Sequence, residues 1–318
     1  MKKLLVALLA LVMVFALVAC GGNGEEEFTW PEEDIEIVVP YNPGGDTDTY
    51  ARELLASLSE ELGVTVSITT MTGSSGTVAA NYVKNDAAND GYTCLFWHSS
   101  ILTNNLFGLS DYSYEAFTNA CTIVENPSYF AFAAPKYKDL QGLIDYAKAN
   151  PGQVVAGGTT GGFNYLATKV FEKALGLEFK YVDCTSAGDA AAEIMAGRMD
   201  LFLTMLPAMK DYVDNGSILN IACLGAERSY AAPDVPTLVE LGYDNVKVKQ
   251  TYGFQFPAGT DQKIIDKFNA AVEKCIATDA YKATNEKYGS SVVAHYGADA
   301  TATWKSEMEY YTQFKQYL

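Results

Sequence analysis

The sequence is poor in positive charge. Its 318 residues include 22 Lys and Arg against 39 Asp and Glu, which gives a formal net charge of −17 at pH 7. Phosphate backbones repel a chain this acidic, so we expect no nucleic-acid partner. The same field opposes long-range attraction of anions, so an anionic ligand would have to be held by local dipoles.

Histidine occurs only twice, at His98 and His295. No Ser-His-acid arrangement can be assembled from motifs, and no G-x-S-x-G elbow is present. No spacing typical of metal ligands occurs either. The sequence therefore predicts a protein that is not an enzyme and has neither a cofactor nor a metal. A small-molecule hydrolase using His98 and a carboxylate is the remaining catalytic alternative.

Closely spaced cysteine pairs are also missing. Cys20 lies at the end of an apolar run, and the other five are Cys94, Cys121, Cys184, Cys223 and Cys275. An odd number at wide spacing indicates neither a disulfide framework nor a zinc site. Because Cys94, Cys121 and Cys223 lie in apolar, strand-like runs, we expect them to be buried free thiols.

The N-terminus has the pattern of an export signal. Lys2 and Lys3 precede an apolar run that ends at Ala19, followed by Cys20. A small residue before such a cysteine resembles the bacterial lipobox, although a signal peptide could also end near a cysteine by chance. We expect residues 1–19 to be the signal peptide, Cys20 to be lipidated, and residues 20–27 to form a flexible tether.

The most informative stretch runs from Val38 to Arg52, with the sequence VVPYNPGGDTDTYAR. It predicts the end of a buried strand, a glycine turn and the first turns of a helix. Such a junction points backbone N–H groups and a positive helix end at one spot, which is a ready anion site. The spacing fits neither nucleotide-binding glycine motif. The alternative is an ordinary strand-to-helix turn.

The same pattern recurs along the chain. Glycine- or serine-rich turns at 70–77, 157–164 and 183–189 each follow a predicted strand and precede a predicted helix, and a strand at 92–97 ends at His98. This alternation predicts a mostly parallel sheet whose ligand crevice lies beyond the carboxyl ends of the strands. About 290 ordered residues suggest two domains.

Further landmarks accompany these turns between about Ile35 and Ala280. They are Val39-Pro40-Tyr41, Gly44-Gly45, Asp48, Ala51-Arg52, Gly73-x-x-Gly76-Thr77, Asp90-Gly91-Tyr92-Thr93, Gly197-x-x-Asp200, Pro233-Asp234-Val235-Pro236-Thr237 and Pro257-Ala258-Gly259-Thr260. In their order and spacing they resemble the substrate-binding proteins of tripartite tricarboxylate transporters, the Bug or TctC family.

The resemblance implies an α/β fold of the type II periplasmic-binding-protein kind, a two-domain flytrap with a central cleft. We place the first domain at 28–134 plus 252–318 and the second at 135–251. The implied function is that of an extracytoplasmic, monomeric lipoprotein that captures a small carboxylate, an organic acid or an amino acid. Its partners would be the two membrane subunits of a secondary transporter. A receptor that presents the solute to a membrane sensor is the alternative.

The family holds its ligands with backbone N–H groups, small hydroxyls and bridging waters. The corresponding ligand-binding residues expected here are Tyr41, Gly44, Gly45, Thr47, Gly73, Ser74, Ser75, Gly76, Thr77, His98, Ser99, Thr159, Thr160, Gly161, Gly162, Asn164, Thr185, Ser186 and Asp189. Four loops, marked by Gly45, Thr77, Gly161 and Thr185, are expected to converge.

The sequence departs from the family at several charged positions. Where the second domain commonly shows Pro-Tyr-Lys-Gly, this chain has Asp183-Cys184-Thr185-Ser186. Asp183 or Asp189 could pair with an ammonium group of an amino-acid-like ligand, or could be solvated or cap the following helix. Asp48 could form a helix-surface pair with Arg52 or brace the glycine loop.

Overall fold

The computed structural model describes residues 28–317, except 128, 185 and 245. The chain divides into a short N-terminal unit that ends at Glu32 and a compact unit from Glu33 onward. All helices and strands of the described residues lie in the second unit. The expected signal peptide, Cys20 and the tether lie outside the described residues.

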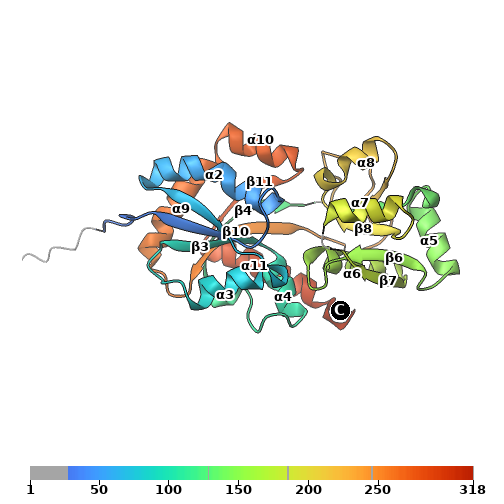
Figure 1. The fold of residues 1–318 in the computed structure, drawn as a ribbon, viewed down its shortest axis with the longest axis horizontal. Helices are drawn as coiled ribbons and strands as arrows, with labels where there is room; N and C mark the ends of the chain where they lie inside the picture. Colours follow the sequence, from blue (N-terminus) through green and yellow to red (C-terminus); the bar gives the residue numbers. More distant parts are fainter. Residues whose placement is uncertain (1–27, 128, 185, 245, 318) are drawn as a thin grey trace, which may run out of the picture. The chain divides into compact units, whose positions relative to one another are not determined.

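The first lobe is built on a six-stranded sheet with the order β11-β4-β10-β3-β1-β2 (Figure 1). Its strands are β1 (Ile35–Val39), β2 (Val66–Thr70), β3 (Thr93–His98), β4 (Phe117–Asn126), β10 (Gln250–Pro257) and β11 (Ser291–Tyr296). Its helices are α2 (Asp46–Leu62), α3 (Thr77–Asn85), α4 (Ser100–Leu106), α9 (Gln262–Ile276), α10 (Asp279–Lys287) and α11 (Ala298–Thr312), with short 3₁₀ turns η1 (Ser74–Gly76) and η2 (Tyr114–Ala116).

The second lobe is built on a five-stranded sheet with the order β7-β6-β8-β5-β9. Its strands are β5 (Phe130–Ala133), β6 (Val154–Gly158), β7 (Phe179–Asp183), β8 (Leu201–Thr204) and β9 (Leu219–Cys223). Its helices are α5 (Leu140–Ala149), α6 (Phe163–Leu175), α7 (Ala187–Met195) and α8 (Lys210–Asp214), with 3₁₀ turns η3 (Pro135–Tyr137) and η4 (Leu206–Ala208). A last 3₁₀ turn, η5 (Lys315–Tyr317), ends the described chain.

Both sheets combine parallel and antiparallel strands. In the first lobe β1 pairs in parallel with β2 and β3, whereas β10 runs antiparallel to β3 and β4. In the second lobe β6 pairs in parallel with β7 and β8, and β5 runs antiparallel to β8 and β9. The expected βαβ units are present, but the expectation of a mostly parallel sheet is wrong, because β4, β10 and β11 in the first sheet and β5 and β9 in the second pair antiparallel.

The chain passes twice between the two sheets. β4 ends at Asn126 in the first sheet and β5 begins at Phe130 in the second, while β9 belongs to the second sheet and β10 to the first. Figure 1 shows β10, in orange, which runs from the side of the second lobe into the first sheet. The division of the chain into domains at 134 and 251 remains a prediction. β5, which ends at Ala133 before the first of these boundaries, already belongs to the second sheet.

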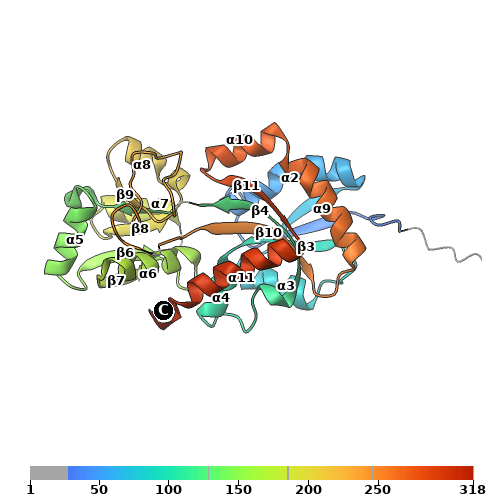
Figure 2. The same cartoon turned by 180° about the vertical axis from the view of Figure 1, so that it is seen from behind.

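The C-terminal helix α11 holds the return crossing. The Tyr311 hydroxyl donates to the carbonyl of Lys249 at 2.6 Å and accepts from the Lys249 N–H at 3.2 Å. The Tyr310 hydroxyl accepts from the N–H of Lys247 at 2.8 Å. In Figure 2, α11, in red, runs from the first lobe toward α6, where Tyr311 packs edge-on against Phe163. Side-chain hydroxyls therefore form hydrogen bonds with backbone groups of the crossing that lie outside either sheet.

The five cysteines outside the N-terminal segment are buried free thiols, as expected for Cys94, Cys121 and Cys223. Burial raises the pKa of the Cys121 thiol to about 12. Thiols that stay protonated are poor nucleophiles, so these side chains act as small apolar groups in the core.

Candidate functional site

The loops at the carboxyl ends of the parallel strands surround a cavity of about 1150 Å³. Residues from the loops after β1, β2, β6 and β7 line it, together with His98 at the end of β3. These are the ends at which a ligand crevice is expected in such sheets. The four loops that the sequence singled out therefore meet at one cavity.

Most of the expected ligand-binding residues line this cavity. They are Tyr41, Gly44, Gly45, Gly73, Ser74, Ser75, Gly76, His98, Thr159, Gly162, Asn164 and Ser186. Thr47, Thr77, Ser99, Thr160, Gly161 and Asp189 are not among the described lining residues. Thr185 lies outside the described residues. Ligand contact by any of these residues remains a prediction.

Three of the hydroxyls that do not line the cavity, those of Thr47, Thr77 and Ser99, have partners inside the protein. The Thr77 hydroxyl donates to the Ser74 carbonyl at 3.0 Å, and the Thr47 hydroxyl bonds to Asp46 at 3.3 Å. The Ser99 hydroxyl is buried and donates to Glu307 at 2.7 Å. These side chains support the cavity wall rather than form its surface.

The loop after β2 has an unusual backbone. Ser74 and Ser75 both have positive φ, 45° and 52°, which costs a non-glycine residue of order 1 kcal/mol or more. Gly76 follows with φ +95°, and a Cβ there would lie 2.5 Å from the Trp97 ring. The Asn104 side chain donates to the Ser75 carbonyl at 3.0 Å and helps to hold this turn against the cavity.

Asp48 combines both roles that the sequence left open. Its Oδ2 accepts from the Gly44 N–H at 2.9 Å and from the Arg52 guanidinium at 2.8 Å. Burial pushes the pKa of Asp48 up, but the bonds from Arg52 and Gly44 outweigh it and hold the pKa below its usual value. Asp48 therefore pairs with Arg52 and braces the glycine loop after β1.

The two aspartates of the second lobe serve its own loops. Ser186 caps α7: its hydroxyl accepts from the Asp189 N–H at 3.1 Å and donates to the Asp189 carboxylate at 2.7 Å. Asp183 Oδ1 accepts from the N–H of Thr160 at 3.2 Å and ties the ends of β6 and β7 together. Both carboxylates thus hold local structure, as helix-capping and turn-bracing groups do.

His98 is a neutral hydrogen-bond donor at the cavity wall. Its Nδ1 accepts from the Ser100 N–H at 3.1 Å, which assigns the ring proton to Nε2. Burial lowers the pKa of His98 to about 4, so the ring carries no charge at neutral pH. Tyr41 stacks on it with ring centroids 4.9 Å apart, and the Trp97 indole N–H bonds to the Tyr41 hydroxyl at 3.1 Å.

Several lining residues were missed by sequence reasoning. They are Pro40, Asn42, Pro43, Asp46, Thr72, Ser100, Tyr129, Phe163, Ala187, Phe202, Thr204, Met205, Pro207, Ala208, Lys210, Asp211, Gln250, Lys287 and Tyr288. Asp46 lies inside the recognised glycine loop and could have been found there. Lys210 on α8 and Lys287 on α10 carry no motif, because only tertiary structure brings these helices to the cavity.

A buried polar cluster lies directly behind His98. The Glu307 carboxylate, on α11, accepts from the Ser99 and Thr251 hydroxyls and lies 3.9 Å from the Lys249 ammonium. Burial raises the pKa of Glu307 to about 7, although Lys249 and the two hydroxyls oppose this shift. The cluster joins β3, β10 and α11 at the crossing between the lobes.

Membrane spans and metal-ligand clusters are both absent from the described residues. Within residues 28–317, with the gaps given above, no helix combines the length and apolarity of a membrane span. In the same part of the chain no group of three or more His, Cys, Asp or Glu side chains could hold a metal ion.

Comparison with known proteins identifies the family. The family model described as "Tripartite tricarboxylate transporter family receptor" matches residues 50–308. Protein BugT of Bordetella pertussis is 29% identical over 279 residues, which cover 86% of this chain and 85% of BugT. The UPF0065 protein in the gbd 5′ region of Cupriavidus necator is 27% identical over 276 residues, covering 81% and 79% of the two chains.

Solved structures give the same result for the fold. The structure of R. palustris Rpa4515 with adipate has a TM-score of 0.79 and 25% identity, covering 90% of this chain and 97% of that one. The periplasmic binding protein BugD has a TM-score of 0.76 and 23% identity, with coverage of 90% and 97%. The expected two-domain periplasmic-binding-protein fold is confirmed. This chain therefore belongs to the receptor family of tripartite tricarboxylate transporters, whose members are solute-binding proteins.

Proposed function

We propose that this protein is an extracytoplasmic lipoprotein receptor that captures a small carboxylate in the cavity between its two lobes. It then presents the solute to the two membrane subunits of a tripartite importer. The observation that carries this proposal is the meeting of four glycine- and hydroxyl-rich loops, from both lobes, at one cavity. The structure of Rpa4515 with adipate, a dicarboxylate, supports a carboxylate ligand, since that protein is 25% identical to this chain.

The second lobe offers the better position for a carboxylate. α6 begins beside the cavity after Gly162 and has no acidic residue in its first turn, so its positive end is unopposed. Asn164 Oδ1 accepts from the N–H groups of Thr159 and Tyr165, at 3.1 and 2.8 Å, and fixes this turn. The amide N–H₂ of Asn164 is then a suitable donor to a carboxylate, whereas the hydroxyls of Thr159 and Ser186 already donate to the Cys184 carbonyl and to Asp189.

Binding would be recognised by thermal unfolding of the chain from residue 28 in the presence of dicarboxylates, tricarboxylates, aromatic acids and amino acids. A ligand at a hundred times its dissociation constant should stabilise the protein by about 2.7 kcal/mol, which raises Tm by several degrees. Asn164→Ala should weaken the response by removing a donor. The matched neutral amides should give no shift. If refolded, ligand-free protein responds to none of the acids, the carboxylate assignment is wrong.

Lipid anchoring is a separate part of the proposal. In cells that process lipoproteins, Cys20→Ala should move the protein from the membrane fraction to the soluble fraction and remove the mass of the acyl chains. Cys184→Ala, a change at a cysteine outside the lipobox, should leave both unchanged. Membrane-bound Cys20→Ala protein would argue for a different anchor.

A further inference from the structure

The first-lobe wall of the cavity carries a carboxylate, Asp46, the first residue of α2. Its Oδ1 accepts from the Thr47 N–H at 2.8 Å and from the Thr47 hydroxyl at 3.3 Å, and its Oδ2 accepts from the Tyr252 hydroxyl. Three donors therefore fix the orientation of a side chain that remains partly exposed. A carboxylate held in this way presents its remaining lone pairs in one direction.

Asp46 occupies the position that the sequence suggested for a ligand anion. The positive end of α2 interacts with the protein's own carboxylate instead, because a helix N-terminus stabilises an acidic side chain. A second carboxylate from a ligand would be repelled there. The first turn of α6, on the other lobe, has no acidic residue. The cavity therefore carries a negative group at the start of α2 and can accept an anion at the start of α6. Its charged lining also includes Lys287 of the first lobe and Lys210 and Asp211 of the second.

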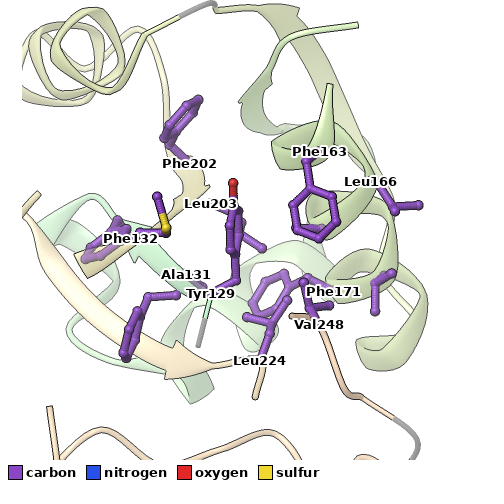
Figure 3. Close-up of a cluster of buried hydrophobic side chains, with 14 of the residues drawn as sticks. Tyr129, Ala131, Phe132, Phe163, Leu166, Phe171, Phe202, Leu203, Leu224 and Val248 are labelled. Atoms are coloured by element: carbon purple, nitrogen blue, oxygen red, sulfur yellow. The ribbon is translucent and has the colours of Figure 1, made fainter. Parts of the chain in front are cut away.

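Two deeply buried polar rings face the same space as Asp46. Tyr129 and His98 line the cavity although they are only 5% and 6% exposed. No described residue hydrogen-bonds to the Tyr129 hydroxyl, and the hydrogen bonds of His98 within the described chain use Nδ1 alone. In Figure 3 the Tyr129 hydroxyl points away from Leu224 and Val248. These groups are free to contact a ligand.

The charge of Asp46 acts on these rings. Burial raises the pKa of Tyr129, and the negative charge of Asp46 adds to this rise. Asp46 also partly offsets the lowering of the His98 pKa by burial. The lining rings, which include Tyr41 and Tyr288, make the surroundings of the carboxylate less polar than water. Attraction between Asp46 and a cation in the cavity is therefore stronger than in bulk solvent.

We propose that Asp46 binds an ammonium group of the ligand, so that this site takes a zwitterion, an amino acid, with its carboxylate toward α6. The inference rests on the proposed function and narrows its ligand class. Asp183 and Asp189 do not serve this role, because their carboxylates already hold the Thr160 and Ser186 turns. Tyr129 is placed to accept a further hydrogen bond from the same ammonium.

The test compares amino acids with the same acids lacking the amino group. Calorimetry with the full mature chain would use L-glutamate and glutarate, L-aspartate and succinate, and L-phenylalanine and 3-phenylpropionate. At least one amino acid should bind more tightly than its partner. Asp46→Asn keeps the size of the side chain and an acceptor for Thr47. It should lower the affinity for that amino acid about 10- to 100-fold, and leave the affinity for the matching acid without the amino group unchanged or higher.

The control is Asp279→Asn, which also removes an aspartate from the first position of a helix, α10, but on the exposed surface outside the cavity lining. It should leave the ratio of the two affinities unchanged. Tighter binding of the acids lacking the amino group, or an unchanged ratio in Asp46→Asn, overturns this inference alone. If none of the six compounds binds, the inference fails together with the proposed carboxylate site.

Discussion

Gly253→Ala should cost this protein about 3 kcal/mol of stability or more, and lower its Tm by about 6 to 12 °C. Gly253 lies in β10, between Trp97 of β3 and Thr122 of β4, next to a register shift in the β10–β4 pairing. A Cβ on Gly253 would lie 2.3 Å from the carbonyl oxygen of Cys121. That oxygen belongs to the backbone of a central strand, so relief requires the sheet itself to move.

Urea and thermal unfolding of the two proteins would measure this loss. Gly188→Ala is the matched control, because Gly188 lies in the first turn of α7 and its added Cβ meets only the Ser186 hydroxyl, at 4.0 Å. That change should be neutral or stabilise by up to about 1 kcal/mol. A Gly253→Ala protein that unfolds within about 2 °C of the wild type would show that the sheet adapts at little cost.

Glu307→Gln should remove the part of the pH dependence of folding stability that comes from this carboxyl group. The pKa of Glu307 is raised in the folded protein to about 7 from its ordinary value of 4.5. The folded state therefore binds this proton more tightly, and the resulting stability is present below pH 4.5 and is lost as pH rises through 7. The full difference is about 3 kcal/mol. Gln keeps the shape without the charge. Relative to the wild type, the free energy of unfolding of the variant should therefore rise by about this amount between pH 4.5 and 8.

The neighbouring His98 should show the opposite sign, and it is the natural comparison. Its pKa is lowered from 6.5 to about 4, so the unfolded state takes up the proton first as pH falls. Stability from neutral His98 is present above pH 6.5 and is lost between pH 6.5 and 4. His98→Gln should flatten the acid side only, whereas Glu307→Gln should act mainly above pH 5. Parallel stability curves for Glu307→Gln and the wild type between pH 5 and 8 would contradict the buried-acid interpretation.

The sequence predicted the local parts of the site well. β-branched runs followed by Gly44-Gly45, Gly73 and Gly161-Gly162 mark strand ends, because glycine there permits a backbone that other residues resist. Parallel strands place such ends on one edge of a sheet, so the meeting of the loops could be predicted from the order of the elements. The burial of Cys94, Cys121 and Cys223 could likewise be predicted, because these thiols lie in apolar, strand-like runs of the sequence.

Non-local features were not predictable in this way. The apolar run from Ala120 to Ala134 reads as one strand, yet β4 and β5 belong to different sheets, and hydrophobic pattern alone does not record a change of sheet. Residues 246–249, strand-like in sequence, instead bond to Leu224 and to the hydroxyls of α11. Lys210 and Lys287 reach the cavity from helices far apart in the chain. Each of these depends on tertiary contacts.

The bonds between α11 and the return crossing bear on the order in which this chain can mature. The hydroxyls of Tyr310 and Tyr311 are separated from Lys247 and Lys249 by 63 and 62 positions. A chain made from its N-terminus therefore completes both sheets' central strands before the groups that hold the passage between them exist. We expect a nascent chain that stops short of α11 to leave this passage without its partners. The helix that secures the passage between the two sheets, α11, is therefore made after the strands that it holds together.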